Sequence, residues 1–340
     1  MTQRASTVLM MLAFLLVSPC ATAQPAAQPA APAPPPPAPL PEFFESEEFI
    51  VTFAKEGDTA ERLAQRFLGD PAKAWTIEEY NRTTSFAQGQ KVIVPKQPWN
   101  LSGVYPNGYQ LVPVLCYHDI LPQGRGRLRM AVKTFEEQMR YLKAQGYHVV
   151  SLADLLEHAS LKRQLPRKTV VLSFDDGWKS FRQYAVPILK ELGFAATLFI
   201  YTDFVGAGTA LTWDDLRELA REGFDIQAHS KTHGDLRRRP GESEADYTRR
   251  LEAELLQPQA LFRRHLGEAK PILAYPYGSH DEEILKRLRD AGYWAALDVR
   301  RQGNPSFTPL LTLHRAQVYA DMTLEQFARN LTVFAEEVIR

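Results

Sequence analysis

Two adjacent carboxylates and two nearby histidines are the residues of this sequence best suited to chemistry. Asp175 and Asp176 end the apolar run in TVVLSFDDG, and His229 and His233 lie four residues apart in HSKTH. Adjacent carboxylates are costly unless something neutralises them. One aspartate and two histidines form a three-ligand metal site with open positions for water and substrate. The pattern therefore predicts a divalent cation, with the second carboxylate free to act as a base.

Two further polar segments also follow apolar strands. Tyr117-His118-Asp119 closes LVPVLCYH, and Tyr275-Pro276-Tyr277-Gly278 closes ILAYPYG. In parallel α/β folds the chemistry gathers at the carboxyl ends of the strands. We therefore expect both segments to lie at the same end of the fold as the aspartates and histidines.

The elements that position these residues alternate from residue 111 onward. Short apolar strands such as TVVLSFDD, AATLFIY and FDIQAHS are separated by amphipathic helices such as FRQYAVPILKELG and TWDDLRELAREG. Continuous apolar strands alternating with helices predict a parallel sheet that is covered on both faces. The number of repeats favours an α/β barrel of seven or eight strands over an open sheet.

Residues 48–98 form a separate small unit with the predicted order strand, helix, helix, strand. EGDT after the first strand, LGD, EYN and GQKVIVP resemble a LysM module. The resemblance implies glycan binding through two loops, with Gly57, Asp58, Thr59 and Gly89 as the candidate contacts. The alternative is a small packing domain without affinity for glycans.

The first residues have the pattern of an export signal. Arg4 precedes the ten-residue apolar run VLMMLAFLLV, which is too short to span a bilayer comfortably, and Ala21-Thr22-Ala23 gives a cleavage pattern. We predict a signal peptide at residues 1–23 and an Ala/Pro-rich linker at residues 24–47. The mature chain is then exported to the periplasm or cell envelope without a transmembrane helix. Lipid attachment at Cys20 is the alternative.

The amino-acid composition limits the binding partners and the cysteine chemistry that we expect. Lys plus Arg and Asp plus Glu each number 40, so the balanced charge gives no support to nucleic-acid or anionic-lipid binding. After removal of the signal, Cys116 is the single cysteine and cannot form an internal disulfide. We expect it to be a buried core residue, because no activating partner is evident. The oligomeric state is not indicated by the sequence.

SFDDGW, HSKTH and YPYG together resemble the motifs of the polysaccharide deacetylases with NodB homology, carbohydrate esterase family 4. We assign residues 110–340 to this domain. The resemblance implies a distorted (β/α) barrel of about seven strands and hydrolysis of N-acetyl, less often O-acetyl, groups. It implies Asp175 as general base, and a metal held by Asp176, His229 and His233. Zinc is the favoured ion, with nickel and cobalt as alternatives.

The same resemblance implies that the substrate contacts Tyr275, Pro276, Tyr277 and Trp178, and that the backbone N–H of Tyr277 stabilises the oxyanion. One departure is Ala274, since many family members carry an arginine there. Nothing else in the sequence obviously braces Asp175.

The general acid is the role with two open candidates. LCYHD and AYPYG are shared with the biofilm-type poly-N-acetylglucosamine deacetylases, a resemblance that implies His118 as the acid. Leu313-His314 is the alternative that many other members use. Arg315 beside it would disfavour the protonated imidazole that an acid needs.

We therefore predict an exported, metal-dependent deacetylase of a polysaccharide that contains N-acetylglucosamine, either a biofilm polymer or peptidoglycan. A glycan-binding envelope protein with a catalytically dead barrel is the second hypothesis. A peptidase or phosphatase that uses the same metal site is the third, and no second set of ligands for a two-metal centre is evident.

Overall fold

The computed structural model describes residues 41–267 and 271–337, and Glu42–Arg340 forms one compact unit. The predicted signal peptide, Cys20 and residues 24–40 of the predicted linker lie outside the described residues. Within the described ranges, no helix combines the length and apolar character needed to cross a membrane.

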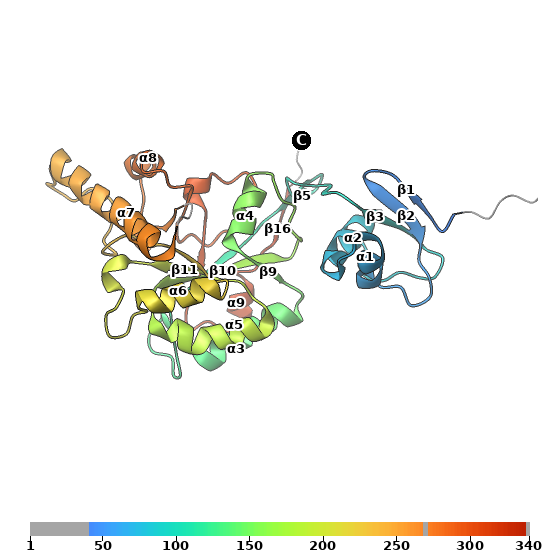
Figure 1. Cartoon of the computed structure of the whole chain (residues 1–340), viewed down its shortest axis with the longest axis horizontal. Helices are drawn as coiled ribbons and strands as arrows, with labels where there is room; N and C mark the ends of the chain where they lie inside the picture. The colour runs from blue at the N-terminus through green and yellow to red at the C-terminus, as the bar shows by residue number, and fades with distance from the viewer. Residues whose placement is uncertain (1–40, 268–270, 338–340) are drawn as a thin grey trace, which may run out of the picture. The chain divides into compact units, whose positions relative to one another are not determined.

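The N-terminal part contains the predicted strand, helix, helix, strand order (Figure 1). Its elements are β2 (Phe49–Phe53), α1 (Ala60–Leu68), α2 (Ala74–Asn81) and β3 (Lys91–Pro95). An extra strand, β1 (Phe43–Glu45), pairs antiparallel with β2, so an ordered strand occupies part of the segment predicted to be linker. Thr59 begins α1 by accepting a hydrogen bond from the N–H of Arg62, and Gly69 ends it with a φ of 71°.

A strongly curled parallel sheet forms the second part. Its strand order is β14 (Ala295–Leu297), β13 (Ile272–Ala274), β12 (Asp225–Ala228), β11 (Thr197–Ile200), β10 (Thr169–Asp176), β6 (Val114–Tyr117) and β15 (Ala316–Gln317). A short strand, β9 (His148–Val150), pairs with the first half of β10. The prediction of a distorted α/β barrel of about seven strands is confirmed.

The two ends of this sheet are connected at Leu313. Its N–H donates to the carbonyl of Ala296, and its carbonyl accepts from the N–H of Asp298. The residues after Leu313 continue into β15, which pairs with β6. The barrel is thus closed by the last strand of the sheet to appear in the sequence.

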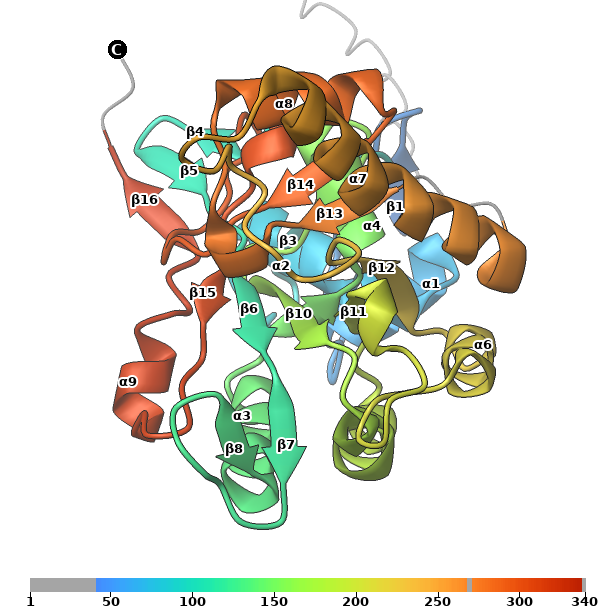
Figure 2. The same cartoon turned by 90° about the vertical axis from the view of Figure 1, so that its left-hand side faces the viewer.

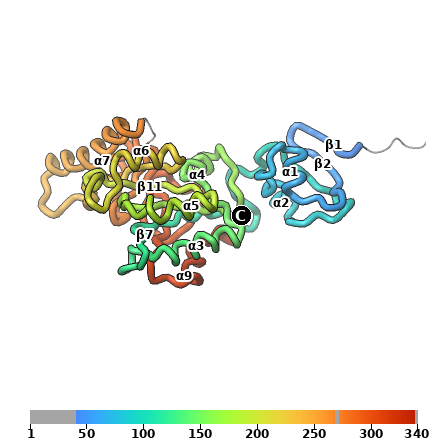
Figure 3. Tube along the Cα trace, turned by 60° about the horizontal axis from the view of Figure 1, so that its bottom comes forward, coloured from blue at the N-terminus to red at the C-terminus, as the bar shows by residue number. Residues whose placement is uncertain are grey.

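Helices cover the outside of the sheet (Figure 2). They are α3 (Val132–Ala144), α4 (Leu152–Ala159), α5 (Val186–Leu192), α6 (Trp213–Arg221), α7 (Glu244–Leu266), α8 (Glu282–Asp290) and α9 (Leu324–Ala328). The Cα trace shows α3 beside α5 and α6 beside α7 (Figure 3). Short pieces complete the fold: β7 (Asp119–Leu121) pairs with β8 (Arg129–Ala131), and β4 (Val104–Tyr105) and β5 (Gly108–Gln110) form a sheet with β16 (Phe334–Glu336).

The interior of the barrel changes character along the strands. Val114, Val171, Phe199 and Leu297 belong to an apolar cluster within it. Two residues further along β6 and β10, Cys116 and Ser173 lie side by side in the register, both fully buried. Because side chains at i and i+2 share a face, the next inward position on β10 is Asp175. The polar end of the barrel interior therefore coincides with the carboxyl ends of the strands.

Candidate active site

Three side chains from two strand ends form a compact ligand cluster. The ligand atoms of Asp176, His229 and His233 all lie within 4.8 Å of one another. Asp176 Oδ1 lies 3.5 Å from His233 Nε2 and 3.9 Å from His229 Nε2. Ligands placed tetrahedrally around one zinc ion lie about 3.4 Å apart, so these separations suit a single ion. The structure therefore brings together the three residues predicted as metal ligands.

Left-handed backbone conformations at the end of β10 direct the side chains of the two aspartates to different places. Asp176 has a φ of 76° and is followed by Gly177 at 93°, which turns the chain sharply at the end of β10. A Cβ on Gly177 would approach Ile200 Cδ1 to 2.8 Å, so a side chain there would force a shift. Asp175 consequently stays inside the barrel while the carboxylate of Asp176 faces the histidines.

His229 is oriented by the neighbouring strand. Its Nδ1–H donates to the carbonyl of Ala274 at 2.7 Å, so Nε2 carries the lone pair that faces the carboxylates. Burial lowers the pKa of His229 more than the nearby Asp175 and Asp176 raise it. A neutral imidazole with Nε2 free is the form that binds a metal ion, so this donor set fits a divalent cation.

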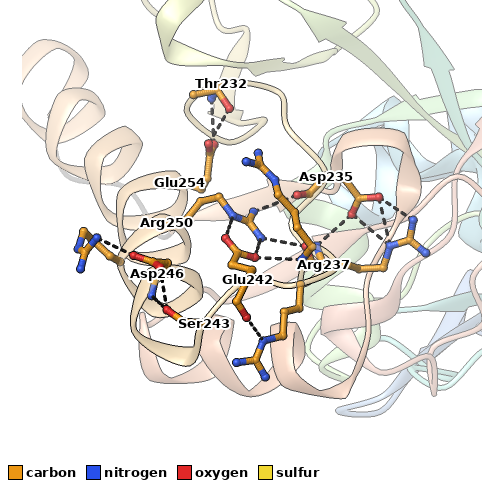
Figure 4. Close-up of polar contacts among 11 residues, drawn as sticks. Thr232, Asp235, Arg237, Glu242, Ser243, Asp246, Arg250 and Glu254 are labelled. Atoms are coloured by element: carbon orange, nitrogen blue, oxygen red, sulfur yellow. Dashed lines mark hydrogen bonds and ion pairs between the residues drawn. The ribbon is translucent and has the colours of Figure 1, made fainter.

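The loop that carries His233 is held by Glu254 of α7 (Figure 4). Glu254 Oε2 accepts hydrogen bonds from the backbone N–H groups of Lys231 and Thr232, each at 2.9 Å, and Oε1 accepts from the Thr232 hydroxyl at 2.6 Å. This carboxylate is buried, with 5% of the residue exposed. It thus fixes the turn in which His233 adopts a φ of 61°.

The loop that follows is tied to the same helix by Arg250. Its guanidinium donates to both carboxylate oxygens of Glu242, at 2.7 and 2.8 Å, and to the backbone carbonyls of Asp235 and Arg237 (Figure 4). Charge-assisted bidentate pairs of this kind are among the stronger hydrogen bonds of proteins. The segment from His233 to α7 is therefore anchored at several points.

Asp175 is braced by an arginine that the sequence analysis did not identify. Arg315 Nη1 lies 2.6 Å from Asp175 Oδ1, and Arg315 itself is fully buried. The expectation that nothing braces Asp175 in the absence of an arginine at position 274 was wrong. Burial raises the pKa of Asp175, but Arg315, followed by His229 and His118, outweighs burial and holds the pKa well below its usual range. One signal in the sequence could have indicated this role: Arg315 is a permanently charged residue within the predicted strand HRAQVY.

The two candidate acids occupy different surroundings. His118 groups with Asp175 and Cys116, with one potential ligand atom of each within 4.8 Å of the others. The Nδ1 atom of His118 is buried and has no hydrogen-bond partner within the described residues. The alternative acid, His314, directs Nδ1 toward both carboxylate oxygens of Asp298, at 3.1 and 3.2 Å. Of the two imidazoles, His118 is therefore the one that groups with the predicted base.

The position of Arg315 also corrects the argument made about His314. The guanidinium of Arg315 is directed at Asp175, whereas the neighbour that His314 contacts is the carboxylate of Asp298. The expectation that Arg315 acts on the imidazole of His314 therefore does not match the contacts that the two side chains make.

The residues expected at the substrate divide into exposed and buried groups. Tyr277 is 68% exposed, has a φ of 59°, and its ring lies 4.8 Å from that of His233. Tyr275 is fully buried and donates its hydroxyl to the carbonyl of Leu311, and Pro276 is also buried. Because Tyr275 and Pro276 are buried, their side chains are not available for the substrate contacts that we expected. Tyr277 is the accessible side chain of the three.

Trp178 contacts the predicted metal ligand directly. Its Nε1–H donates to Asp176 Oδ2 at 3.0 Å, so that Oδ1 is the oxygen of this carboxylate that faces His233. The indole packs edge-to-face on Phe204 at 4.9 Å, and Tyr201 stacks on Phe204 at 5.0 Å. Tyr201 and Phe204 follow β11, and the sequence analysis missed this aromatic wall because aromatic residues after a strand are also common in cores.

The candidate glycan contacts of the N-terminal part already have structural roles. Asp58 is buried and accepts hydrogen bonds from Arg66 and from the backbone N–H of Lys55. Thr59 caps α1, and Gly57 and Gly89 have φ angles of 76° and 79° in turns. These positions shape the two loops, and Asp58 does not present a free carboxylate to a ligand.

Comparison with known proteins identifies the kind of domain in which this site lies. A family model described as "Polysaccharide deacetylase" matches residues 162–296. That range includes the predicted base and all three predicted metal ligands, but neither His118 nor Arg315.

Similar proteins extend the comparison beyond that range. The Bacillus subtilis protein YxkH, whose name gives polysaccharide deacetylase as an inferred activity, is 27% identical over 64% of this chain and 74% of its own length. The poly-beta-1,6-N-acetyl-D-glucosamine N-deacetylase of Escherichia coli K12 is 23% identical over 75% of this chain, and the match spans 42% of that protein. The structure of the Streptococcus pyogenes deacetylase PplD with acetate superposes with a TM-score of 0.59 at 23% identity, covering 66% of this chain and 99% of PplD.

Proposed function

We propose that this chain is a polysaccharide deacetylase, in keeping with the family model that matches residues 162–296, and that it hydrolyses N-acetyl groups of a polysaccharide built on N-acetylglucosamine. The observation that carries the proposal is the cluster of Asp176, His229 and His233 beside the buried Asp175. Such a cluster matches amide hydrolysis assisted by one divalent cation.

Asp176, His229 and His233 would hold the cation. When bound, a divalent cation polarises a carbonyl and lowers the pKa of water. His229 presents Nε2 because its Nδ1–H is bound to the carbonyl of Ala274. Trp178 and Glu254 fix the other two ligands, one by a hydrogen bond to Asp176 and the other through the loop of His233. Zinc is the favoured ion, because two imidazoles and a carboxylate suit it.

Asp175 is the proposed general base that removes a proton from the attacking water. Arg315 keeps this carboxylate ionised inside the barrel, where burial alone would favour the protonated acid. As water adds to the acetamide carbon, the carbonyl oxygen of the acetamide gains negative charge. The backbone N–H of Tyr277 is the proposed hydrogen-bond donor to that oxygen.

His118 is the proposed general acid. After water has added, the carbon–nitrogen bond breaks and the amine of the sugar must gain a proton while acetate leaves. His118 directly follows β6, groups with Asp175, and has a buried ring nitrogen free of protein partners within the described part of the chain. His314 is the second candidate, and its Nδ1 contacts the carboxylate of Asp298.

The substrate that we favour is a β-1,6-linked N-acetylglucosamine polymer. Support comes from the name of the Escherichia coli relative and from the aromatic residues Trp178, Phe204 and Tyr277 beside the ligand cluster. Aromatic faces pack well against the apolar faces of sugar rings. We further propose that the protein acts in the periplasm or cell envelope and that the LysM-like N-terminal part holds the polymer.

Acetate release tests the proposal directly. The purified chain is incubated with β-1,6-linked N-acetylglucosamine oligomers, peptidoglycan and chitin oligomers, first as prepared, then with excess chelator, then with zinc, cobalt or nickel restored. We expect release to stop with chelator and to return with metal, and the β-1,6-linked oligomers to be the best substrate. Release that persists at full rate in excess chelator would reject the metal-assisted mechanism. A metal-loaded protein that binds glycan but releases no acetate would favour the alternative of a non-catalytic glycan-binding protein.

A further inference from the structure

A cavity whose lining includes none of the residues of the ligand cluster lies within the compact unit Glu42–Arg340. Its volume is about 690 Å³, within the usual range for sites that bind small ligands. The lining residues are Glu79, Tyr80, Arg82, Trp99, Tyr105, Pro106, Asn107 and Arg167. None of them takes part in the site described above.

Three aromatic rings form one wall of this cavity. Tyr80 and Trp99 meet edge-to-face with ring centres 5.5 Å apart, and Trp99 and Tyr105 meet in the same way at 6.2 Å. The guanidinium of Arg167 lies over the ring of Tyr105 at 4.2 Å. Rings that pack against one another in this way form a rigid apolar surface, which suits the flat face of a sugar ring.

Two buried polar atoms at the cavity lack partners in the described part of the chain. They are Glu79 Oε2, an acceptor, and Trp99 Nε1, a donor. The other oxygen of Glu79 accepts a hydrogen bond from the backbone N–H of Arg167 at 2.6 Å, which holds the carboxyl group in place. Because buried polar groups in folded proteins nearly always have partners, an acceptor and a donor left open beside a cavity point to a ligand that supplies both.

The charges around the cavity indicate the kind of ligand. Arg82 and Arg167 line it together with the single carboxyl group of Glu79, so a ligand with an ammonium group would face two cations. Hydroxyl and acetamide groups are uncharged, and they offer both hydrogen-bond donors and acceptors. The aromatic wall and the open donor and acceptor are therefore satisfied together by an uncharged sugar.

We propose that this cavity is a second glycan site, which binds one or two N-acetylated sugar units of the polymer and disfavours glucosamine that has lost its acetyl group. The choice of N-acetylglucosamine as the sugar rests on the function proposed above. Such a site holds acetylated stretches of the polymer near the enzyme and releases them once they have been processed. Its lining does not include the loop residues Asp58 and Thr59, which have internal partners.

The indole signal of Trp99 gives a local test in the full chain. The protein is labelled with ¹⁵N and carries Asp175→Asn to prevent turnover, and Trp99→Phe identifies the Trp99 indole resonance. A β-1,6-linked N-acetylglucosamine tetramer is then added, and in a separate titration the corresponding glucosamine tetramer. We expect the acetylated tetramer to shift the Trp99 signal and the glucosamine tetramer to leave it unchanged. A Trp99 signal that stays in place while that of Trp178 moves would overturn the second site, and equal shifts with both tetramers would overturn its selectivity.

Affinity measurements on a matched pair complete the test. Glu79→Gln should weaken the binding that shifts Trp99 by about tenfold, as the loss of one buried hydrogen bond to a ligand does. Glu78→Gln changes the neighbouring carboxylate of the same helix, which does not line the cavity, and should bind normally. Equal affinities of the two variants would reject the site. Acetate release by the unsubstituted chain is measured in parallel: its absence, with the Trp99 shift intact, would reject the deacetylase function and retain the binding site.

Discussion

Arg315 and Asp175 form an ion pair inside the barrel, 140 residues apart in the sequence, with Nη1 and Oδ1 separated by 2.6 Å. Both residues are buried, at 0% and 4% exposure. A carboxylate in this position would lose its charge without a cation nearby. The pair therefore decides whether Asp175 is available as a base.

Replacing Arg315 by methionine keeps much of the buried volume and removes the charge. We expect the free energy of unfolding to fall by about 3–5 kcal/mol, because an uncompensated carboxylate remains buried. The turnover number should fall toward the roughly hundred- to ten-thousand-fold loss expected without a general base. Denaturant unfolding and acetate release measure the two effects. Arg301→Met, at an exposed position, is the control.

A double-mutant cycle separates the ion pair from simple packing. The combination of Arg315→Met with Asp175→Asn should be less destabilising than the sum of the single substitutions, since no buried charge is then left alone. Strict additivity would show that the contact with Asp175 contributes nothing specific.

The two aspartates should respond differently to the same substitution. Asp175→Asn is expected to abolish acetate release while the protein still binds one metal ion, because the base is not a ligand. Asp176→Asn should weaken metal binding first, because only His229 and His233 remain. Metal titration by calorimetry distinguishes the two variants. Normal metal affinity in both would contradict the assigned roles.

Glu254 offers a test of how the loop supports the metal ligand. Glu254→Gln places an amide N–H₂ where the carboxylate accepted from Lys231 and Thr232, so the loop of His233 should loosen. We expect the dissociation constant for zinc to rise by about 10- to 100-fold, the usual cost of losing support for a ligand. Glu252→Gln, an exposed residue of the same helix, should bind zinc normally. A role in folding alone would instead lower thermal stability without changing the affinity of the folded protein.

The choice of general acid can be made by comparing two alanine variants. His118→Ala should reduce the turnover number by about a hundred- to ten-thousand-fold with the metal content intact. His314→Ala should change it by less than roughly tenfold, since this imidazole contacts Asp298 and not the predicted base. The reverse ranking, measured on folded and metal-loaded proteins, would assign the role to His314.

Glu79 should leave a mark on the pH dependence of stability. Burial raises its pKa to about 7, and its contact with the backbone of Arg167 only partly opposes this. An unfolded chain loses this proton at about pH 4.3, so stability falls as the pH rises from there to about 7. Glu79→Gln removes this contribution, and the stability difference between the two proteins should change across that window and level off above it. Thermal unfolding at several pH values measures this, with the exposed Glu56→Gln as control.

Much of this fold could be predicted because local patterns repeat. Apolar strands such as TVVLSFDD and helices that end at glycine indicate the α/β barrel, and the ends of β10 and β12 indicate the ligand cluster. What could not be predicted depends on contacts between distant segments. Nothing local to Arg315 reveals that its side chain extends along the barrel interior to Asp175, or that Tyr275 is buried while Tyr277 two residues later is exposed.

Because the barrel closes at Leu313, the ligand cluster and the ion pair between Arg315 and Asp175 depend on different parts of the fold. The three proposed metal ligands lie on segments that precede Leu313, whereas Arg315 follows it on the strand that joins β14 to β6. Undocking of that one strand would leave the ligand cluster assembled and take the counter-ion away from Asp175. If the proposed roles hold, metal content would therefore report only that the segments before Leu313 have folded. We expect a chain cleaved or frayed beyond Leu313 to bind metal in such an assay and yet release no acetate.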